Sequence, residues 1–270
     1  MNLIFLPFLI AIFFLPASLM ASNNSILVQS TTSTKNSGFY DYILPLFEAE
    51  TRIFVNIVAV GTGAAIKNAM NCDGDVLLVH SPEHEQKFIA DGFARHRYDL
   101  MYNNFVIVGP KTDPAKLGNH QDARFAFQKI AHNKAKFTSR SDNSGTHFKE
   151  LSIWKKANIN PVEASGKWYI ETGSGMGTTL NIAIGMRAYT LVDKASWYAY
   201  ANKHDHTIFV QSDLQLFNPY GVMLIDNKKC PSVKSKEGQI FINWLISKKG
   251  QAAISNFRIN GKSAFTPNAK

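Results

Sequence analysis

The chain has 270 residues and a formal net charge of +9, from 29 Lys and Arg against 20 Asp and Glu. Hydrophobic residues make up 45% of it, which is ordinary for a globular protein and argues against a disordered chain. The positive charge favours anionic partners. Nucleic acid is poorly supported among them, because the Lys and Arg residues are scattered and no basic helix carries interleaved aromatic residues.

The N-terminus is an apolar run of signal-peptide length that ends in small residues. We expect residues 1–21 to be a signal peptide cleaved after Ala21, with Ala17 as the other cleavage site. The run lacks Lys and Arg, so an N-terminal membrane anchor is the alternative. Pro7 and Pro16 interrupt the run, however, and a comfortable span needs about 20 apolar residues. No Cys lies near the cleavage site, which disfavours a lipid anchor. We therefore expect an exported, soluble, periplasmic protein.

Beyond this run, short apolar strands alternate with helical stretches. In the first half, we predict strands at 26–28, 54–60, 76–79 and 105–109 and helices at 39–49, 64–70 and 82–92. In the second half, we predict helices at 122–133, 145–157, 178–188 and 238–257 and strands at 135–139, 168–172, 188–193, 207–212 and 220–226. This rhythm predicts an α/β fold with mainly parallel sheets flanked by helices.

The predicted elements form two α/β units. If the strand at 220–226 returns to pair near the strand at 105–109, the chain crosses twice between two lobes. We then expect lobe 1 to be discontinuous, with residues 22–104 and 218–270, and lobe 2 to span 105–217.

Four predicted strand-to-helix turns, at 30–38, 60–65, 139–147 and 171–179, are rich in Gly, Ser and Thr. A helix N-terminus has unpaired backbone N–H groups and a partial positive charge. Glycine lets a ligand approach the backbone, and hydroxyls add uncharged donors. A single such turn is explained by helix capping alone. Four of them in one chain favour an anion-binding site.

Arg140 adds a cation to one of these turns, four residues before Ser144. Its guanidinium is a planar fork of donors suited to oxyanions. The alternative is a surface ion pair with Asp142. In a combined interpretation, Asp142 holds the guanidinium in place for the ligand.

The motifs resemble those of the tungstate-binding proteins of ABC importers, in family order and over nearly the whole mature chain. They are Ser30-Thr31-Thr32-Ser33, VAVGTGAAIK, DVLLVHSPEHEQKF, MYNNFVIVGPKTDP, SRSDNSGTHFKEL, WYIETGSGMGTTL, AYTLVD and NPYGVM. The resemblance implies a two-lobed periplasmic binding protein of type II-like fold. It would hold tungstate or molybdate between its lobes and deliver the anion to a membrane permease and its ATPase.

The turns and the resemblance together give the expected binding site. Its members are Thr31, Thr32, Ser33 and Thr62 from one lobe, Arg140, Ser144, Gly145 and Thr146 from the other, and the backbone of Gly175 and Met176. We expect no catalytic residue, no cofactor and no protein-bound metal cation, and we expect a monomer. The family pattern has Thr at Ser30, Asp at Asn143 and Arg at Lys194, and these departures bear on which oxyanion is bound.

A more distant resemblance, to phosphate-binding proteins of ABC importers, rests on Arg140 and on the Ser-Gly-Thr that follows at 144–146. Those proteins also carry a carboxylate after the third strand, which accepts the proton of hydrogen phosphate. The matching stretch at 79–82 has no acid. Because a proton-free dianion needs donors only, this favours tungstate or molybdate, with a phosphate- or sulfate-binding protein as the alternative.

Two patterns imitate enzyme motifs. The glycines at 173–177, followed by Asp193, loosely resemble a dinucleotide-binding turn, but the spacing is GxGxG rather than GxGxxG. The HxxEH pattern at 80–84 resembles a zinc-peptidase helix, but Pro82 belongs in a first helical turn and leaves His80 before it. A nucleotide-using enzyme and a zinc peptidase are therefore minor alternatives, and we expect a protein that is not an enzyme.

The two cysteines, Cys72 and Cys230, allow one disulfide in an oxidising compartment. Two free buried thiols are equally compatible with the sequence.

Overall fold

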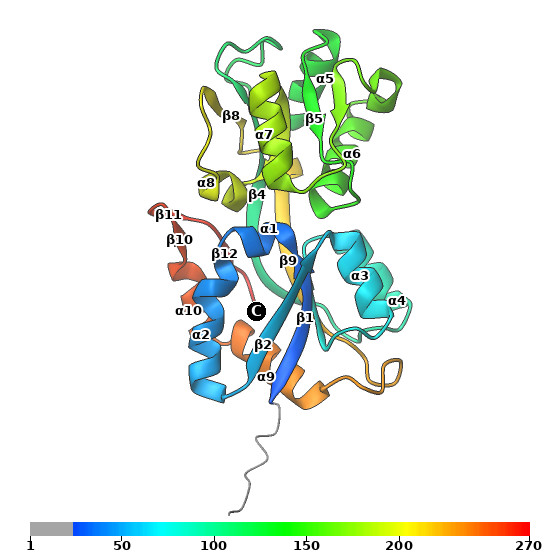
Figure 1. Ribbon diagram of the computed structural model, residues 1–270, viewed down its shortest axis with the longest axis vertical. Helices are drawn as coiled ribbons and strands as arrows, with labels where there is room; N and C mark the ends of the chain where they lie inside the picture. The colour runs from blue at the N-terminus through cyan, green and yellow to red at the C-terminus, as the bar shows by residue number, and fades with distance from the viewer. Residues whose placement is uncertain (1–23) are drawn as a thin grey trace, which may run out of the picture.

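The computed structural model describes residues 24–270, and the expected signal peptide at 1–21 lies outside them (Figure 1). The strands are β1 (Ser25–Thr31), β2 (Phe54–Val60), β3 (Val76–Val79), β4 (Tyr98–Pro110), β5 (Phe137–Ser139), β6 (Tyr169–Glu171), β7 (Tyr189–Asp193), β8 (His206–Val210), β9 (Phe217–Leu224), β10 (Arg258–Ile259), β11 (Lys262–Ser263) and β12 (Thr266–Pro267). The helices are α1 (Thr32–Asn36), α2 (Phe39–Thr51), α3 (Thr62–Met70), α4 (Pro82–Ala90), α5 (Ala123–His132), α6 (Gly145–Lys156), α7 (Met176–Met186), α8 (Lys194–Ala199), α9 (Ser235–Ile246) and α10 (Lys248–Asn256), with 3-10 turns η1 (Pro161–Ala164) and η2 (Leu214–Leu216). Within this part of the chain, none of the helices combines the length and apolarity that crossing a bilayer requires.

The strands follow the order β2-β1-β3-β9-β4-β7-β5-β6, with β8 and β12 also paired to β4. The pairs β1–β2, β1–β3, β5–β6 and β5–β7 are parallel, as predicted for α/β units. The pairs that β4 and β9 make with each other and with β3, β7 and β8 are antiparallel. The predicted α/β fold is confirmed, and both sheets are mixed because the connecting strands run against the others.

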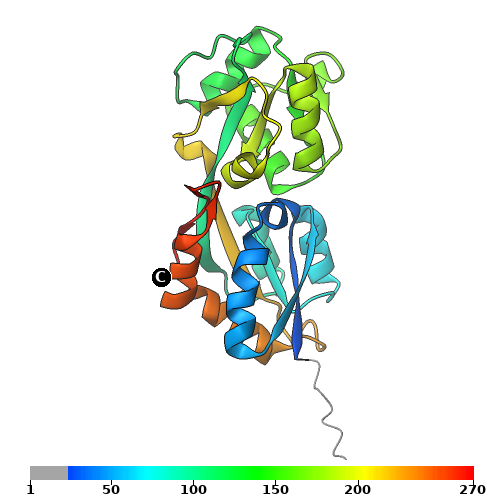
Figure 2. The same ribbon diagram turned by 60° about the vertical axis from the view of Figure 1, so that its left-hand side comes forward.

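Two lobes are visible in Figure 1: lobe 1, below, is built on β1, β2 and β3, and lobe 2, above, is built on β5, β6 and β7. Figure 2 shows β4 and β9 running between them. Residues 98–104 of β4 pair with β9, whereas residues 105–108 pair with β7. One strand therefore belongs to both sheets, and its middle lies between the lobes.

Each sheet is covered on both faces. In lobe 1, α2, α9 and α10 bury one set of side chains, including Phe39, Phe47, Phe241 and Trp244, and α3 and α4 bury another, including Ala65, Ile66 and Phe88. In lobe 2, α5 and α6 pack Phe127 and Trp154 against Phe137, while α7 and α8 pack Leu180 and Trp197 against Val192. These layers fix the strand ends, from which the turns of the site project.

Several elements differ from the sequence-based predictions. The helix predicted at 238–257 is two helices, because Ser247 ends α9 and its Oγ caps α10 by accepting from the N–H of Gly250 at 3.1 Å. A Cβ on Gly250 would lie 2.2 Å from the carbonyl oxygen of Trp244. The short helices α1 and α8 were not predicted. The strand predicted at 105–109 is longer, because its polar first half pairs with β9.

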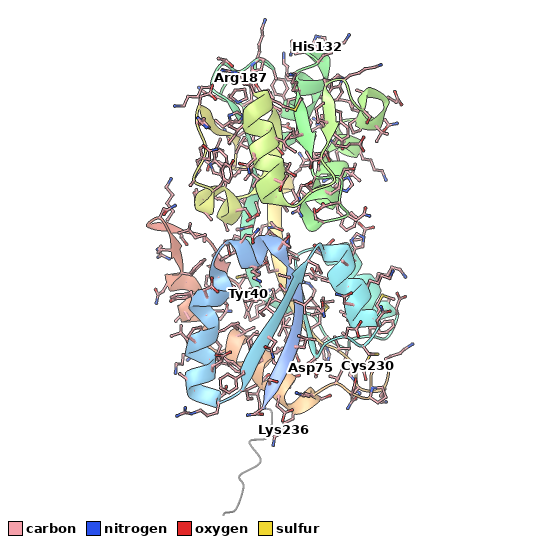
Figure 3. The ribbon with its side chains drawn as sticks, in the orientation of Figure 1. Tyr40, Asp75, His132, Arg187, Cys230 and Lys236 are labelled. Atoms are coloured by element: carbon pink, nitrogen blue, oxygen red, sulfur yellow. A yellow bond between two sulfur atoms is a disulfide. The ribbon has the colours of Figure 1, made fainter. Side chains whose placement is uncertain are left out.

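Cys72 and Cys230 form a disulfide, with a Cα–Cα distance of 5.2 Å. The bond joins the loop after α3 to the loop after β9, and the two cysteines are 158 residues apart in the sequence. Cys230 lies on the outer side of lobe 1 (Figure 3). A cross-link that closes so long a loop restricts the unfolded chain.

We predict that replacing both cysteines by Ser lowers the free energy of unfolding by about 2–5 kcal/mol, because the unfolded chain gains freedom. Urea unfolding followed by circular dichroism measures this change. Reduction of the unmodified protein should lower the stability by a similar amount. An unchanged midpoint in both experiments would contradict the stabilising role of the bond.

Candidate anion-binding site between the lobes

Turns that follow β1, β2, β3 and β5 meet where the two lobes face each other. They enclose a small pocket. Its lining residues are Thr31, Thr32, Ser33, Val60, Gly61, Thr62, His80, Arg140, Ser144 and Gly145. These residues come from both lobes, so an ion held here would contact both of them.

The β1–α1 turn contributes a group of hydroxyls. Thr31 caps α1, and its Oγ1 accepts from the N–H of Thr34 at 3.4 Å and lies 3.2 Å from Ser33 Oγ. Ser30, by contrast, donates its hydroxyl to the carbonyl of Leu78 at 2.9 Å and also bonds the hydroxyl of Tyr40. The departure from the family pattern at Ser30 therefore falls on a residue that bonds inside lobe 1 and does not line the pocket.

Arg140 lines the pocket with its side chain only 3% exposed. Its Nη2 donates to Asp142 Oδ2 at 2.6 Å, and its Nε has no hydrogen-bond partner. The other carboxylate oxygen, Asp142 Oδ1, accepts from the N–H of Ser144 at 3.2 Å. Asp142 thus anchors one side of the guanidinium, and a buried donor on Arg140 is left for a ligand. This geometry matches the combined interpretation of the Arg140–Asp142 pair.

The start of α6 uses part of its donor capacity internally. Ser144 Oγ accepts from the N–H of His147 at 3.2 Å, and the N–H of Gly145 donates to Thr62 Oγ1 at 3.0 Å. A hydroxyl that accepts still has its own hydrogen to give. The hydroxyls of Thr62 and Ser144 can therefore donate into the pocket, whereas the Gly145 N–H is already occupied.

The two lobes touch around this pocket. Besides the Gly145–Thr62 bond, the N–H of Gly63 donates to the carbonyl of Asn143 at 3.3 Å, and the rings of His84 and Phe148 stack with centroids 4.2 Å apart. A Cβ added to Gly145 would lie 2.9 Å from the ring of His80, which leaves no room for a side chain there. The structure is therefore a closed form.

The second departure from the family pattern, Asn143, contributes its backbone to this contact. Its φ of 56° is left-handed, a conformation that Asn adopts more readily than most residues. The third departure, Lys194, starts α8 with its Nζ 5.8 Å from the ring centroid of Tyr198. Neither residue lines the pocket, so the departures leave its donors unchanged.

Three expected site residues are not on the pocket wall. Thr146 is buried next to Gly145, and its Oγ1 has no hydrogen-bond partner. Gly175 and Met176 start α7, and their turn is joined to Arg140 through the N–H of Ser174, which donates to the Arg140 carbonyl at 3.1 Å. These three lie beside the pocket without lining it, and their contact with a ligand stays a prediction.

Three lining residues were not expected: Val60, Gly61 and His80. His80 follows β3, at the position where the phosphate-binding proteins carry their carboxylate, and this position was the available signal. Its Nε2 lies 3.2 Å from Ser33 Oγ, and its ring stacks on Tyr220 with centroids 4.7 Å apart. Burial lowers the pKa of His80, against the opposing charge of Asp193. The imidazole is therefore neutral near pH 7 in this structure.

The HxxEH pattern does not form one helical face. Pro82 begins α4, so His80 precedes the helix and only His84 lies on it. In residues 24–270, no group of three or more His, Cys, Asp or Glu is arranged to hold a metal ion. The pocket itself holds no carboxylate, and its chemistry is that of hydrogen-bond donors with one fixed positive charge.

Comparison with known proteins places this chain in a family. The model of the "PBP superfamily domain" matches residues 20–249. The "Tungstate-binding protein TupA" of Peptoclostridium acidaminophilum is 40% identical over 252 residues, which cover 92% of this chain and 87% of the relative. The solved structure titled "Tungstate binding protein - TupA - from Desulfovibrio alaskensis G20" is 40% identical, with a TM-score of 0.80 over 91% of this chain and 99% of that chain. The structure titled "The crystal structure of the tungstate ABC transporter from Geobacter sulfurreducens" is 42% identical, with a TM-score of 0.78 over 86% and 98%. The chain therefore belongs to the PBP superfamily and, within it, to the family of the tungstate-binding proteins.

Proposed function

We propose that this protein is the substrate-binding component of an ABC importer and captures tungstate or molybdate between its lobes. The observation that carries the proposal is the buried Nε of Arg140, which lacks a partner beside a pocket without carboxylates. An unsatisfied buried donor costs about 1–3 kcal/mol, more for a charged group, and a bound anion would remove that cost. Two relatives described above are named as tungstate-binding proteins, which supports the same ligand.

The ligand set is proposed as follows. Thr31, Thr32, Ser33 and Thr62 donate from lobe 1, Arg140 and Ser144 donate from lobe 2, and Gly145, Thr146, Gly175 and Met176 complete the surroundings of the anion. A hydrogen bond to a charged group contributes about 1.5–3 kcal/mol net. Several such bonds, less the costs of immobilisation and desolvation, are compatible with binding of about −12 kcal/mol, which is nanomolar affinity.

The lobes are proposed to be residues 22–104 with 218–270, and residues 105–217. The change of pairing partner along β4, from β9 at Asn104 to β7 at Phe105, supports this division. Closure of the lobes around the anion would create the surface that the membrane permease and its ATPase recognise. A cleaved signal peptide at 1–21 would place the mature monomer in the periplasm, without a lipid anchor.

We further propose that binding is the whole function and that no reaction or cofactor is involved. The lining side chains offer donors to an anion, and Ser144, the hydroxyl nearest in sequence to a histidine, uses its oxygen to cap α6. A relative from Haloferax volcanii, 42% identical, is named "Putative ABC transporter anion-binding protein", which supports this proposal.

The ligand is tested by titration calorimetry with tungstate, molybdate, sulfate and phosphate. We expect tight binding of tungstate and molybdate, because both are proton-free tetrahedral dianions. Hydrogen phosphate should bind more weakly, since the pocket offers no carboxylate to accept its proton. Tight binding of phosphate or sulfate alone would instead favour the alternative, a phosphate- or sulfate-binding protein of the same architecture.

The role of Arg140 is tested by substitution. We predict that Arg140→Ala weakens tungstate binding by about tenfold or more, because the anion loses a charged, buried donor. Arg187→Ala is the matched control: Arg187 is exposed at the far end of lobe 2, where it pairs with Asp205 (Figure 3). Calorimetry on both variants, with circular dichroism to verify folding, decides the matter. Equal affinity for Arg140→Ala and the unmodified protein would refute the role.

Closure of the lobes is tested at Gly145. We predict that Gly145→Ala weakens tungstate binding by about 1–3 kcal/mol, the usual cost of overpacking, because its Cβ would meet the His80 ring. The ring is stacked on Tyr220 and cannot easily move aside. Gly185→Ala, in α7, serves as the control, since a Cβ there has no heavy atom within 4 Å.

Small-angle scattering of the same variants measures the shape. The Gly145→Ala protein with saturating tungstate should stay more extended than the control. Identical affinities and identical scattering for the two variants would show that the Gly145 contact does not limit closure.

A further inference from the structure

His80 is, with Arg140, one of two ionisable residues that line the pocket. It is 4% exposed and sits within the contact between the lobes, where its ring touches the position of Gly145. Its Nε2 lies 3.2 Å from Ser33 Oγ, a member of the proposed ligand set. A change in the protonation of His80 would therefore change the charge of the pocket itself.

The other ring nitrogen is fixed from the connecting strands. His80 Nδ1 lies 2.9 Å from Asn218 Oδ1 on β9. The amide of Asn218 donates its Nδ2 to Asn103 Oδ1 on β4 at 2.7 Å, so its oxygen faces the histidine. Because an amide oxygen only accepts, Nδ1 carries the hydrogen of the neutral ring. Nε2 is then the nitrogen at which a proton enters or leaves.

Three charged groups act on His80. Burial is the main cause of its low pKa, and Arg140 and Lys149 lower the pKa further, whereas Asp193 raises it. Asp193 is linked to the same hydrogen-bond chain, since Asn103 Nδ2 donates to its Oδ1 at 3.4 Å. The Tyr220 hydroxyl, behind the ring, has a pKa raised by burial and stays neutral.

One more carboxylate is close in sequence. Glu85, on α4 just after His80, accepts from the N–H of Ser81 at 2.5 Å and is paired with Arg97. Its charge is therefore balanced within lobe 1. Burial and the positive groups outweigh Asp193 at His80.

We propose that His80 takes up a proton at Nε2 when the anion binds, so that the protein captures a dianion together with one proton. His80 lines the pocket, so a dianion bound there lies close to the ring and favours its charged form. The protonated ring donates a hydrogen bond toward the anion. Its Nε2 can then no longer accept a hydrogen bond from Ser33, so the hydroxyl of Ser33 is free to donate to the anion as well. His80 thereby turns from an acceptor in the empty pocket into a donor in the loaded one.

The sign of the pH dependence follows from this exchange. In this structure burial lowers the pKa of His80, and a bound dianion raises that pKa. Between the two pKa values the complex binds more protons than the free protein, so affinity falls as pH rises. One full proton corresponds to about a tenfold loss of affinity per pH unit. The inference rests on the proposed function, because it requires an anion in this pocket.

The experiment is titration calorimetry with sodium tungstate at about pH 7, in two buffers that differ in ionisation enthalpy and are not oxyanions. The slope of the observed enthalpy against the ionisation enthalpy counts the protons exchanged. We expect the unmodified protein to take up between about half a proton and one proton per anion. His80→Gln should bind without uptake and with an affinity that no longer depends on pH. His132→Gln, at the far end of lobe 2 (Figure 3), should behave as the unmodified protein.

Two other ionisable groups, on α6, could also take up a proton, and the experiment must distinguish them from His80. Burial raises the pKa of Glu150 to about 7, and Glu150 accepts from Trp154 and Tyr169 inside lobe 2. His147 accepts the N–H of Asn143 at 3.2 Å beside the pocket. If either group were the proton acceptor, Glu150→Gln or His147→Gln would abolish the uptake and His80→Gln would retain it, which would overturn the inference.

The outcomes distinguish this inference from the proposed function. Tight tungstate binding without proton uptake would overturn the role of His80 and leave the proposed function standing. Absence of tungstate binding would overturn the proposed function itself. Should His80→Gln fail to fold, NMR titration of the ring protons of His80 in the unmodified protein gives the answer. Its pKa should rise on addition of tungstate, and an unchanged pKa would contradict the proposal.

Discussion

The ion pair between Arg140 and Asp142 is the interaction on which the site depends. A guanidinium that is almost fully buried would destabilise the fold if it had no partner. Asp142 compensates one side of it and also accepts the N–H of Ser144, which ties the cation to the start of α6. The Nε of Arg140 has no hydrogen-bond partner within the protein, and a bound anion would supply one.

The two strands that connect the lobes also position a residue of the site through hydrogen bonds. β4 and β9 join the two sheets, and where they pass between the lobes they carry Asn103 and Asn218. The side-chain amides of Asn103 and Asn218 form a buried hydrogen-bond chain from Asp193 to His80. A buried polar network stabilises the fold only when each of its groups has a hydrogen-bond partner. Movement of one lobe against the other would bend the strands that carry this chain. The geometry therefore connects closure of the lobes with the hydrogen bonding of a pocket residue.

Much of the fold follows from local sequence. The apolar run 76–79 is a strand as predicted, because buried strands in α/β proteins read as continuous hydrophobic segments. The run 54–60 is also a strand, although it lies at the sheet edge and is mostly not buried. Thr31, Ser33, Arg140 and Ser144 were expected in one pocket and do line it. Their residue types reveal their chemistry, since hydroxyls and an arginine beside helix starts are donors wherever those starts meet.

The sequence by itself determined the alternation of strands and helices, the donor-rich turns and the absence of an acid after the third strand, because each of these features depends only on residues that are adjacent in the chain. Only the tertiary structure decided which donors remain free. The N–H of Gly145 donates to Thr62 in the other lobe, and the hydroxyl of Ser30 donates to a carbonyl inside lobe 1. His80 lines the pocket, where Asn218 from a distant strand bonds its ring. Hydrogen bonds between residues far apart in the chain leave no local pattern. Which polar group faces a ligand is therefore settled by packing and not by residue type.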